Sequence, residues 1–222
     1  MSLDIRALPS PNFNDRKTPV SLILLHYTGM ETGAAAIERL CDPEASVSAH
    51  YVVEEAGRVL QLVGEDKRAW HAGVSYWRGE RDINSASIGI EIVNGGHEFG
   101  LPNFPDAQIG AVMELVGAVM GRHGISPAGV IGHSDVAPGR KEDPGEKFPW
   151  QRLADAGLAL ALPDAPGRAG APETLLAGIG YDPDAGLKAV LEAFQRRWRP
   201  ARVDGHLDDE TRDLIARVAS AA

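Results

Sequence analysis

The fold is decided by the stretch Ser21-Leu22-Ile23-Leu24-Leu25-His26, an apolar run that ends in a histidine. A continuous apolar run of this length is typical of a strand that is buried on both faces of a parallel sheet. Proteins of the α/β class place their ligands at the carboxyl ends of such strands, which is where His26 stands. The stretch therefore predicts an α/β fold whose functional site includes His26.

Further strands and helices are predicted downstream of this stretch. Residues 50–53 and 58–63 read as a hairpin closed by Gly57, and apolar runs predict strands at 88–93 and 130–131. Residues 105–123 carry apolar side chains at the spacing of one helix face, and a shorter helix is expected over 33–40. The fold class we expect is α/β, with a mixed central sheet flanked by helices.

A second candidate segment runs from Gly132 to Gly145 and contains His133, Lys141 and Asp143 among two prolines and three glycines. Loops set by Pro and Gly hold side chains where a regular element could not. With His26, they supply two histidines and one carboxylate, a set that leaves one zinc position open for water. Spacing alone leaves chance proximity open, because the chain has seven histidines and these ligands form no compact motif.

Five segments occur in the order Leu24–Thr28, Val47–Val53, Ala69–Gly73, Ser87–Ile92 and His133–Gly145. In this order they resemble the type-2 N-acetylmuramoyl-L-alanine amidases, a zinc family that includes peptidoglycan recognition proteins. The resemblance implies that His26, His133 and Asp143 bind Zn²⁺. It also implies hydrolysis of the amide between N-acetylmuramic acid, or its 1,6-anhydro form, and L-alanine of the stem peptide, in peptidoglycan turnover or recycling.

The resemblance also implies roles for further residues. Glu91 is expected to take the proton of the attacking water, and Lys141 to stabilise the oxyanion on the attacked carbonyl. The alternatives are a solvated strand glutamate and a solvated lysine. Tyr27, Trp70 and His71 are expected to contact substrate, with Trp70 offering a flat apolar face and a free indole N–H.

The remaining histidines and the single cysteine have less support. For His50, a hydrogen-bonded core or supporting imidazole and a direct substrate contact are both open. His97, His123 and His206 are interpreted as surface or helix-end residues. Cys41 is interpreted as a buried structural thiol, since no basic cluster adjoins it.

The chain is expected to divide at residues 161–173, a Pro/Gly/Ala-rich linker between an amidase domain (1–160) and a helical domain (174–222). The latter resembles the three-helix peptidoglycan-binding domain at 194–198 and 203–211. We expect it to recruit polymeric murein, so that truncation after Leu162 spares soluble substrates. The alternative is a brace that packs on the amidase domain and buries Phe194 or Trp198.

Charge and composition restrict the partners. Lys and Arg total 22 against 31 Asp and Glu, a net charge of −9, which disfavours nucleic acid. Peptidoglycan fragments or murein are the expected partners. The sequence as it stands has no secretory or membrane-spanning run, which predicts a cytoplasmic protein; a periplasmic or wall-associated protein exported by an unrecognised route is the alternative.

Two other functions are open. One is a non-catalytic peptidoglycan recognition protein, which is disfavoured because all three ligand positions and both helper positions are occupied. The other is a zinc hydrolase that acts on a different amide. The sequence leaves open the choice between anhydro-muropeptides and intact murein, the stem-peptide specificity, the ligand of the C-terminal domain and the oligomeric state.

Overall fold

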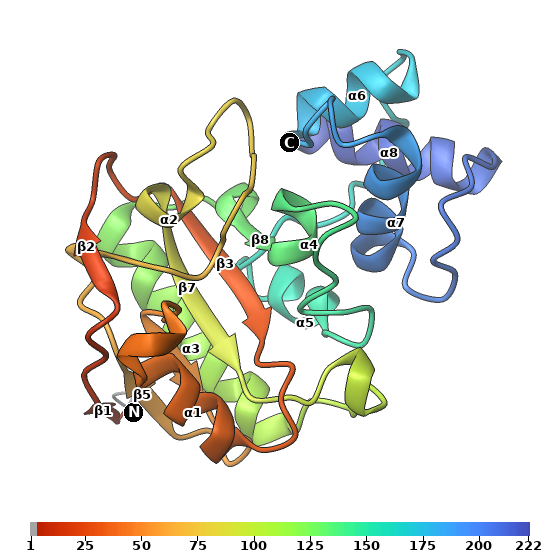
Figure 1. Ribbon diagram of the computed structural model, residues 1–222. Helices are drawn as coiled ribbons and strands as arrows, with labels where there is room; N and C mark the ends of the chain where they lie inside the picture. The colour runs from red at the N-terminus through yellow and green to blue at the C-terminus, as the bar shows by residue number, and fades with distance from the viewer. Residues whose placement is uncertain (1–3) are drawn as a thin grey trace.

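A six-stranded sheet forms the centre of the protein in the computed structural model, which describes residues 4–222. The strand order is β1-β5-β4-β7-β3-β8, and the four strands from β4 to β8 in this order run parallel (Figure 1). Strand β5 pairs antiparallel with β4, as the predicted hairpin requires, and β2 pairs with β6 in a separate small sheet. The strands are β1 (Ile5–Ala7), β2 (Phe13–Asp15), β3 (Leu22–Tyr27), β4 (Tyr51–Val53), β5 (Val59–Gln61), β6 (Lys67–Ala69), β7 (Ser87–Ile92) and β8 (Val130–Gly132).

The helices confirm the longer predicted elements and add short ones that the sequence pattern did not show. Helix α3 begins at Asp106 and ends at His123, with Gly124 in the left-handed conformation directly after it, within one residue of the prediction. The short helices α2, α4 and α5 were not predicted. The helices are α1 (Gly33–Cys41), α2 (Ile83–Ala86), α3 (Asp106–His123), α4 (His133–Val136), α5 (Trp150–Asp155), α6 (Pro172–Ile179), α7 (Leu187–Trp198) and α8 (Asp209–Ala221), with 3₁₀ turns at Pro43–Ala45, His97–Phe99 and Pro127–Gly129.

The two faces of strand β3 pack into different cores, because successive side chains of a strand point to opposite sides. Ile23 and Leu25 join a core with β7 and α3, whose buried face includes Ile109 and Val112. Leu22 and Leu24 face the other way. Cys41 lies at the end of α1, half-buried and free.

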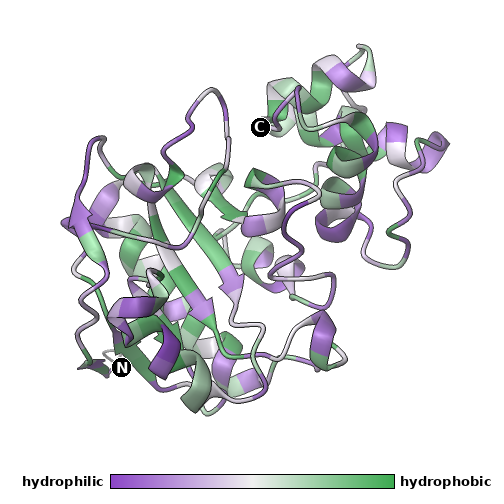
Figure 2. Cartoon of the chain, in the orientation of Figure 1, coloured by the Kyte–Doolittle hydropathy of each residue, from purple (hydrophilic) through white to green (hydrophobic). Residues whose placement is uncertain are grey.

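The second core joins the sheet to the C-terminal helices. Leu22 and Leu24 of β3 share one cluster of buried side chains with Leu176, Tyr181 and Phe194. Helix α6 packs against α8, and α7 packs against α4 (Figure 1). In Figure 2 these helices carry apolar residues on the sides that face one another and the sheet, and polar residues outside.

This packing agrees with the alternative in which the C-terminal helices pack on the amidase domain as a brace. Phe194 is fully buried, and Trp198 packs partly buried against the same cluster. Residues 161–171 contain neither helix nor strand, yet the helices after them are not separated from the sheet by solvent. Across residues 4–222, none of the helices combines the length and the apolar character that crossing a bilayer requires.

Candidate active site

Parallel pairing brings the ends of three strands together at one edge of the sheet. His26 of β3 lies beside Glu91 of β7 in register, and Leu25 lies beside Gly132, the last residue of β8. His133 follows Gly132 directly and begins α4. The apolar strands thus deliver two histidines and one glutamate to a single point, as the first stretch of the sequence predicted for His26.

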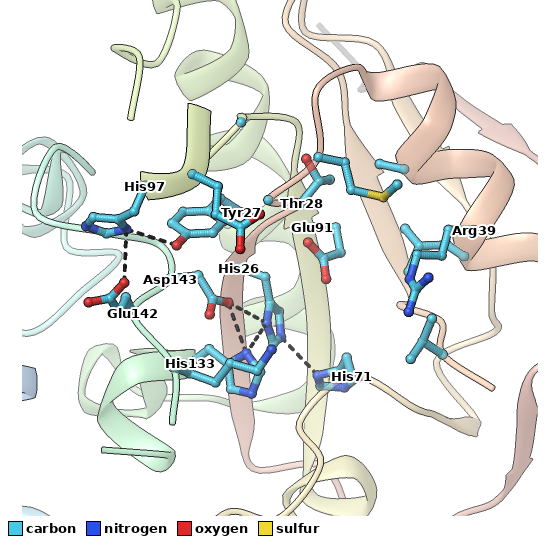
Figure 3. Close-up of a pocket in the computed structure, with 18 of the residues that line it drawn as sticks. His26, Tyr27, Thr28, Arg39, His71, Glu91, His97, His133, Glu142 and Asp143 are labelled. Atoms are coloured by element: carbon cyan, nitrogen blue, oxygen red, sulfur yellow. Dashed lines mark hydrogen bonds and ion pairs between the residues drawn. The ribbon is translucent and has the colours of Figure 1, made fainter. Parts of the chain in front are cut away.

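His26, His133 and Asp143 converge on one point, as Figure 3 shows. The Nδ1 atoms of His26 and His133 are 2.9 Å apart, and they lie 2.9 Å and 3.0 Å from Oδ2 of Asp143. All three residues are buried. The cluster is formed by the three residues that the sequence predicted as ligands.

The outer nitrogens of the two rings fix which inner nitrogens carry lone pairs. His133 Nε2 donates to the carbonyl of Ala72 at 3.0 Å, so in the neutral ring Nδ1 is an acceptor. His26 Nε2 faces Nδ1 of His71 at 3.0 Å, and His71 in turn faces Ser87. Burial, followed by the charge of His133, lowers the pKa of His26 to about 4, so this ring is neutral at pH 7.

With Nε2 of each ring carrying the proton, the inner side of the cluster presents two imidazole lone pairs and one carboxylate oxygen. Two imidazole nitrogens and one carboxylate oxygen, 2.9–3.0 Å from one another, form a donor set that a cation bound between them would satisfy. The donor set of two imidazoles and a carboxylate suits a borderline-soft divalent ion. The residues fit a metal site, with partners behind each histidine that hold its orientation.

Glu91 stands next to this cluster with one oxygen unsatisfied. Its Oε2 is buried and has no hydrogen-bond partner among residues 4–222. Burial, with the charge of Asp143 adding to it, raises the pKa of the Glu91 carboxyl well above its ordinary value. The neighbours Ile88, Ile90 and Ile92 point into the opposite core, which leaves Glu91 on the face of the metal cluster. A carboxylate with this environment is suited to accept a proton.

A cleft of about 430 Å³ opens over the cluster and Glu91. Lys141, Tyr27, Trp70 and His71 all line it, so the structure brings every predicted site residue to this place. The indole N–H of Trp70 is not free, however, because it donates to Asn14 Oδ1 at 2.9 Å. That part of the prediction was wrong, since the pairing of β2 with β6 could not be foreseen from the sequence.

His71 lies behind His26 as well as along the cleft. Its Nδ1 is 3.0 Å from His26 Nε2, and its ring crosses that of His26 edge-on at 5.1 Å. Through this contact His71 holds the ring of His26 in place, in addition to any contact that it makes with substrate. For His50, the structure favours a hydrogen-bonded core imidazole over a direct substrate contact. The ring is fully buried, and its Nδ1 accepts the N–H of Gly89.

Two cleft residues were missed by the sequence analysis. His97, interpreted as a surface residue, lines the cleft, and its Nδ1 lies 2.9 Å from the hydroxyl of Tyr27 and 3.6 Å from Oε2 of Glu142 (Figure 3). Its Nε2 lies 3.0 Å from Oε2 of Glu146. Arg140 donates to the carbonyls of Ala72 and Val74 and so holds the backbone on which His133 rests. Neither carries a sequence signal beyond its position near a motif, because the loops that bring them in are irregular.

The last two histidines lie away from the site. His123 ends α3 and contacts Glu65 at 2.8 Å, as a helix-end residue, and His206 is exposed beside Asp204. These two interpretations agree with the structure.

Comparisons with known proteins agree with this geometry. The family model for N-acetylmuramoyl-L-alanine amidase matches residues 16–146. The chain is 37% identical to N-acetylmuramoyl-L-alanine amidase AmiD of Escherichia coli strain K12, over 88% of this chain and 80% of AmiD. It is 34% identical to 1,6-anhydro-N-acetylmuramyl-L-alanine amidase AmpD of Haemophilus influenzae, over 67% of this chain and 90% of AmpD.

A solved structure extends the likeness to nearly the whole chain. AmiD from E. coli, in complex with anhydro-N-acetylmuramic acid-L-Ala-D-γ-Glu-L-Lys, superposes with a TM-score of 0.81 at 34% identity, covering 93% of this chain and 92% of AmiD. The match includes the C-terminal helices, because residues 1–160 alone would make up less than 93% of the chain. More than half of the sequence fits the family model and the fold is shared throughout, so this chain belongs to the N-acetylmuramoyl-L-alanine amidase family of enzymes.

Proposed function

We propose that this protein hydrolyses the amide bond between N-acetylmuramic acid, in its 1,6-anhydro form, and the L-alanine that begins a stem peptide, with zinc as its metal. The observation that carries the proposal is the convergence of the donor atoms of His26, His133 and Asp143 beside the unpaired carboxylate of Glu91. The names of AmiD and AmpD support the bond, and the ligand in the AmiD complex supports the substrate class.

His26, His133 and Asp143 would hold the zinc. When bound there, zinc supplies a Lewis acid for the scissile carbonyl and lowers the pKa of the attacking water. The protein contributes three ligands with the orientation already set, because Nε2 of each histidine is engaged by His71 or by the carbonyl of Ala72. Little rearrangement is then needed on metal binding.

Glu91 would take the proton from water as it attacks the carbonyl carbon. The raised pKa of its carboxyl makes the carboxylate a stronger base, and the proton that it takes up would pass to the amide nitrogen as the carbon–nitrogen bond breaks. The products are then a free muramic carboxylate and the amino group of L-alanine. Lys141 lines the same cleft and would donate to the oxyanion that develops on the carbonyl.

Tyr27, Trp70 and His71 form the walls of the cleft beside the reacting groups. Trp70 would offer the face of its ring to a sugar or lactyl group, while its N–H remains with Asn14. We keep as part of this proposal the division into an amidase domain (1–160), a linker (161–173) and a peptidoglycan-binding-like segment (174–222). The predicted cytoplasmic location stays a prediction.

The test uses the full-length protein, two substrates and one ligand variant. Incubation with an anhydro-muropeptide and with intact sacculi, followed by mass spectrometry, should show free stem peptide that begins with L-alanine. Metal analysis should show one zinc per chain, absent in His133→Ala and retained in the control His206→Ala, which alters an exposed side chain. Cleavage at another bond, or full zinc occupancy in His133→Ala, contradicts the proposal.

A further inference from the structure

The C-terminal segment reaches the short helix that carries the metal ligand His133. Asp135 stands two residues after His133 on α4 and is 1% exposed. Its Oδ1 accepts the hydroxyl of Tyr181 at 2.7 Å, and Arg197 Nη1 lies 3.5 Å from its Oδ2. Tyr181 lies between α6 and α7, and Arg197 lies on α7. The C-terminal segment thus supplies two polar partners of one buried carboxylate.

Asp135 also holds the backbone that orients His133. Its Oδ2 accepts the N–H of Gly132 at 2.9 Å, which closes the turn between β8 and α4 directly before the ligand. Helix α4 is only four residues long, too short to be stable by itself. The direction of the His133 side chain therefore depends on contacts with the rest of the fold, and the hydrogen bond from Tyr181 to Asp135 adds one to the contact with the carbonyl of Ala72.

The tyrosine is suited to this contact. Burial, followed by the charge of Asp135, raises the pKa of the Tyr181 hydroxyl well above its ordinary value, so the group remains a donor. Its ring is packed edge-on against Trp77 and Phe194, with centroid distances of 5.2 Å and 6.3 Å. The hydroxyl is consequently aimed at Asp135 by the shared core.

Two consecutive arginines of α7 reach the loops of two metal ligands. Arg197 donates to the carbonyl of Val130 on β8 at 3.2 Å, besides its contact with Asp135. Arg196, which is 8% exposed, donates to Glu142 at 3.2 Å, one residue before the ligand Asp143. Helix α7 therefore contacts the backbone segments that carry both His133 and Asp143.

We propose that the C-terminal helices position the metal ligands of the amidase site, with Tyr181 and Arg197 acting on His133 through Asp135. In this view the segment is part of the metal centre, whatever it binds through its outer surface. Tyr181 and Arg197 are positioning residues, since neither contacts the cluster itself. The inference rests on the proposed function for the metal and for the three residues that bind it.

The test is the zinc affinity of full-length variants, measured by competition with a chelator. Tyr181→Phe removes one hydroxyl and keeps the packed ring, and we expect its zinc affinity to fall roughly tenfold, the lower end for groups that act through a ligand. Arg197→Met should lower the zinc affinity by a similar factor, and this variant replaces Tyr181→Phe in the test if Tyr181→Phe folds poorly. Val218→Ala, a truncation in the same core that removes no polar partner of Asp135, is the control for lost packing.

A double variant tests the route through Asp135. If Tyr181 acts through this carboxylate, Tyr181→Phe should cause no additional loss of zinc affinity in an Asp135→Asn background. Unchanged affinity in both Tyr181→Phe and Arg197→Met overturns the inference, as does an equal loss in Val218→Ala at matched thermal stability. A wild-type protein that binds no zinc would instead contradict the proposed function, so the two failures are distinguishable.

Discussion

The ring of His71 lies so close to Gly89 that a Cβ at this glycine would come within 2.6 Å of three ring atoms. Strand β7 is apolar and buried on either side of this position, at Ile88 and Ile90. The absence of a side chain at Gly89 makes the space in which His71 contacts His26. A glycine inside a strand weakens the strand, and here it allows the ring of His71 to approach the backbone closely.

Gly89→Ala should displace His71 and weaken zinc binding. Without the contact at Nε2, His26 loses the partner that fixes its ring, and affinity should fall about 10- to 100-fold. Chelator competition measures this. The control is Gly110→Ala on α3, where nothing lies within 4 Å of the new methyl group, and zinc affinity should not change. Equal affinity in the two variants would show that His71 does not support His26.

Glu91→Gln and Lys141→Met should separate chemistry from binding. Each removes a group that acts in the transition state, so kcat should fall at least about a hundredfold while KM and zinc content stay near wild type. Steady-state kinetics on an anhydro-muropeptide with parallel metal analysis measures all three quantities. Lys188→Met changes an exposed lysine of α7 and is the control. An effect confined to KM would refute both catalytic roles.

Glu65 should make stability depend on pH in the acid range. Burial raises the pKa of its carboxyl, but hydrogen bonds from Arg122, His123 and Tyr51 outweigh this and lower it to about 2. Because the folded pKa lies below the usual 4.5, the charged group stabilises the fold above pH 4.5, and this contribution is lost as pH falls towards 2.

The measurement is urea unfolding at pH 7, 4.5 and 3. Glu65→Gln should unfold at lower urea than wild type at pH 7, and the difference should shrink at pH 3. Glu192→Gln removes a partly exposed partner of Lys188 and should change little at any pH. A difference that stays constant from pH 7 to pH 3 would contradict the assignment to the ionised Glu65.

Truncation after Leu162 should destabilise the amidase domain, contrary to what the linker composition alone suggests. It would expose Leu22, Leu24 and Ile131, which share a core with the C-terminal helices. We expect a lower melting temperature, weaker zinc binding and loss of activity on soluble and polymeric substrates alike.

A nicked protein provides the matched control. A protease site introduced in the irregular segment around residues 164–169 and then cleaved leaves the helices in place without a covalent tether. If packing is what matters, the nicked protein should stay associated and active on an anhydro-muropeptide. A truncated protein that melts like wild type and cleaves the soluble substrate normally would return the segment to the role of a recruiting domain.

Local sequence patterns predicted the longer regular elements, and the ordered motifs indicated the chemistry of the site. Apolar runs predicted β3 and β7, and the apolar spacing in 105–123, with Asp106 near its start and Gly124 directly after its end, predicted helix α3 within one residue. The residue types and their motifs indicated His26, His133 and Asp143 as ligands. These signals are local, because strand and helix periods and chain reversals leave their pattern in neighbouring residues.

Only the tertiary structure decided the rest. His26 and His133 are 107 positions apart, and Asp135 and Tyr181 are 46 apart, so their contacts exist only once the sheet and the C-terminal helices have packed. The same packing placed His71 behind His26 and brought His97 into the cleft. It also placed the C-terminal helices and the sheet in one core. Composition could not show this, because a Pro/Gly-rich segment can join two separate domains or two parts of one core.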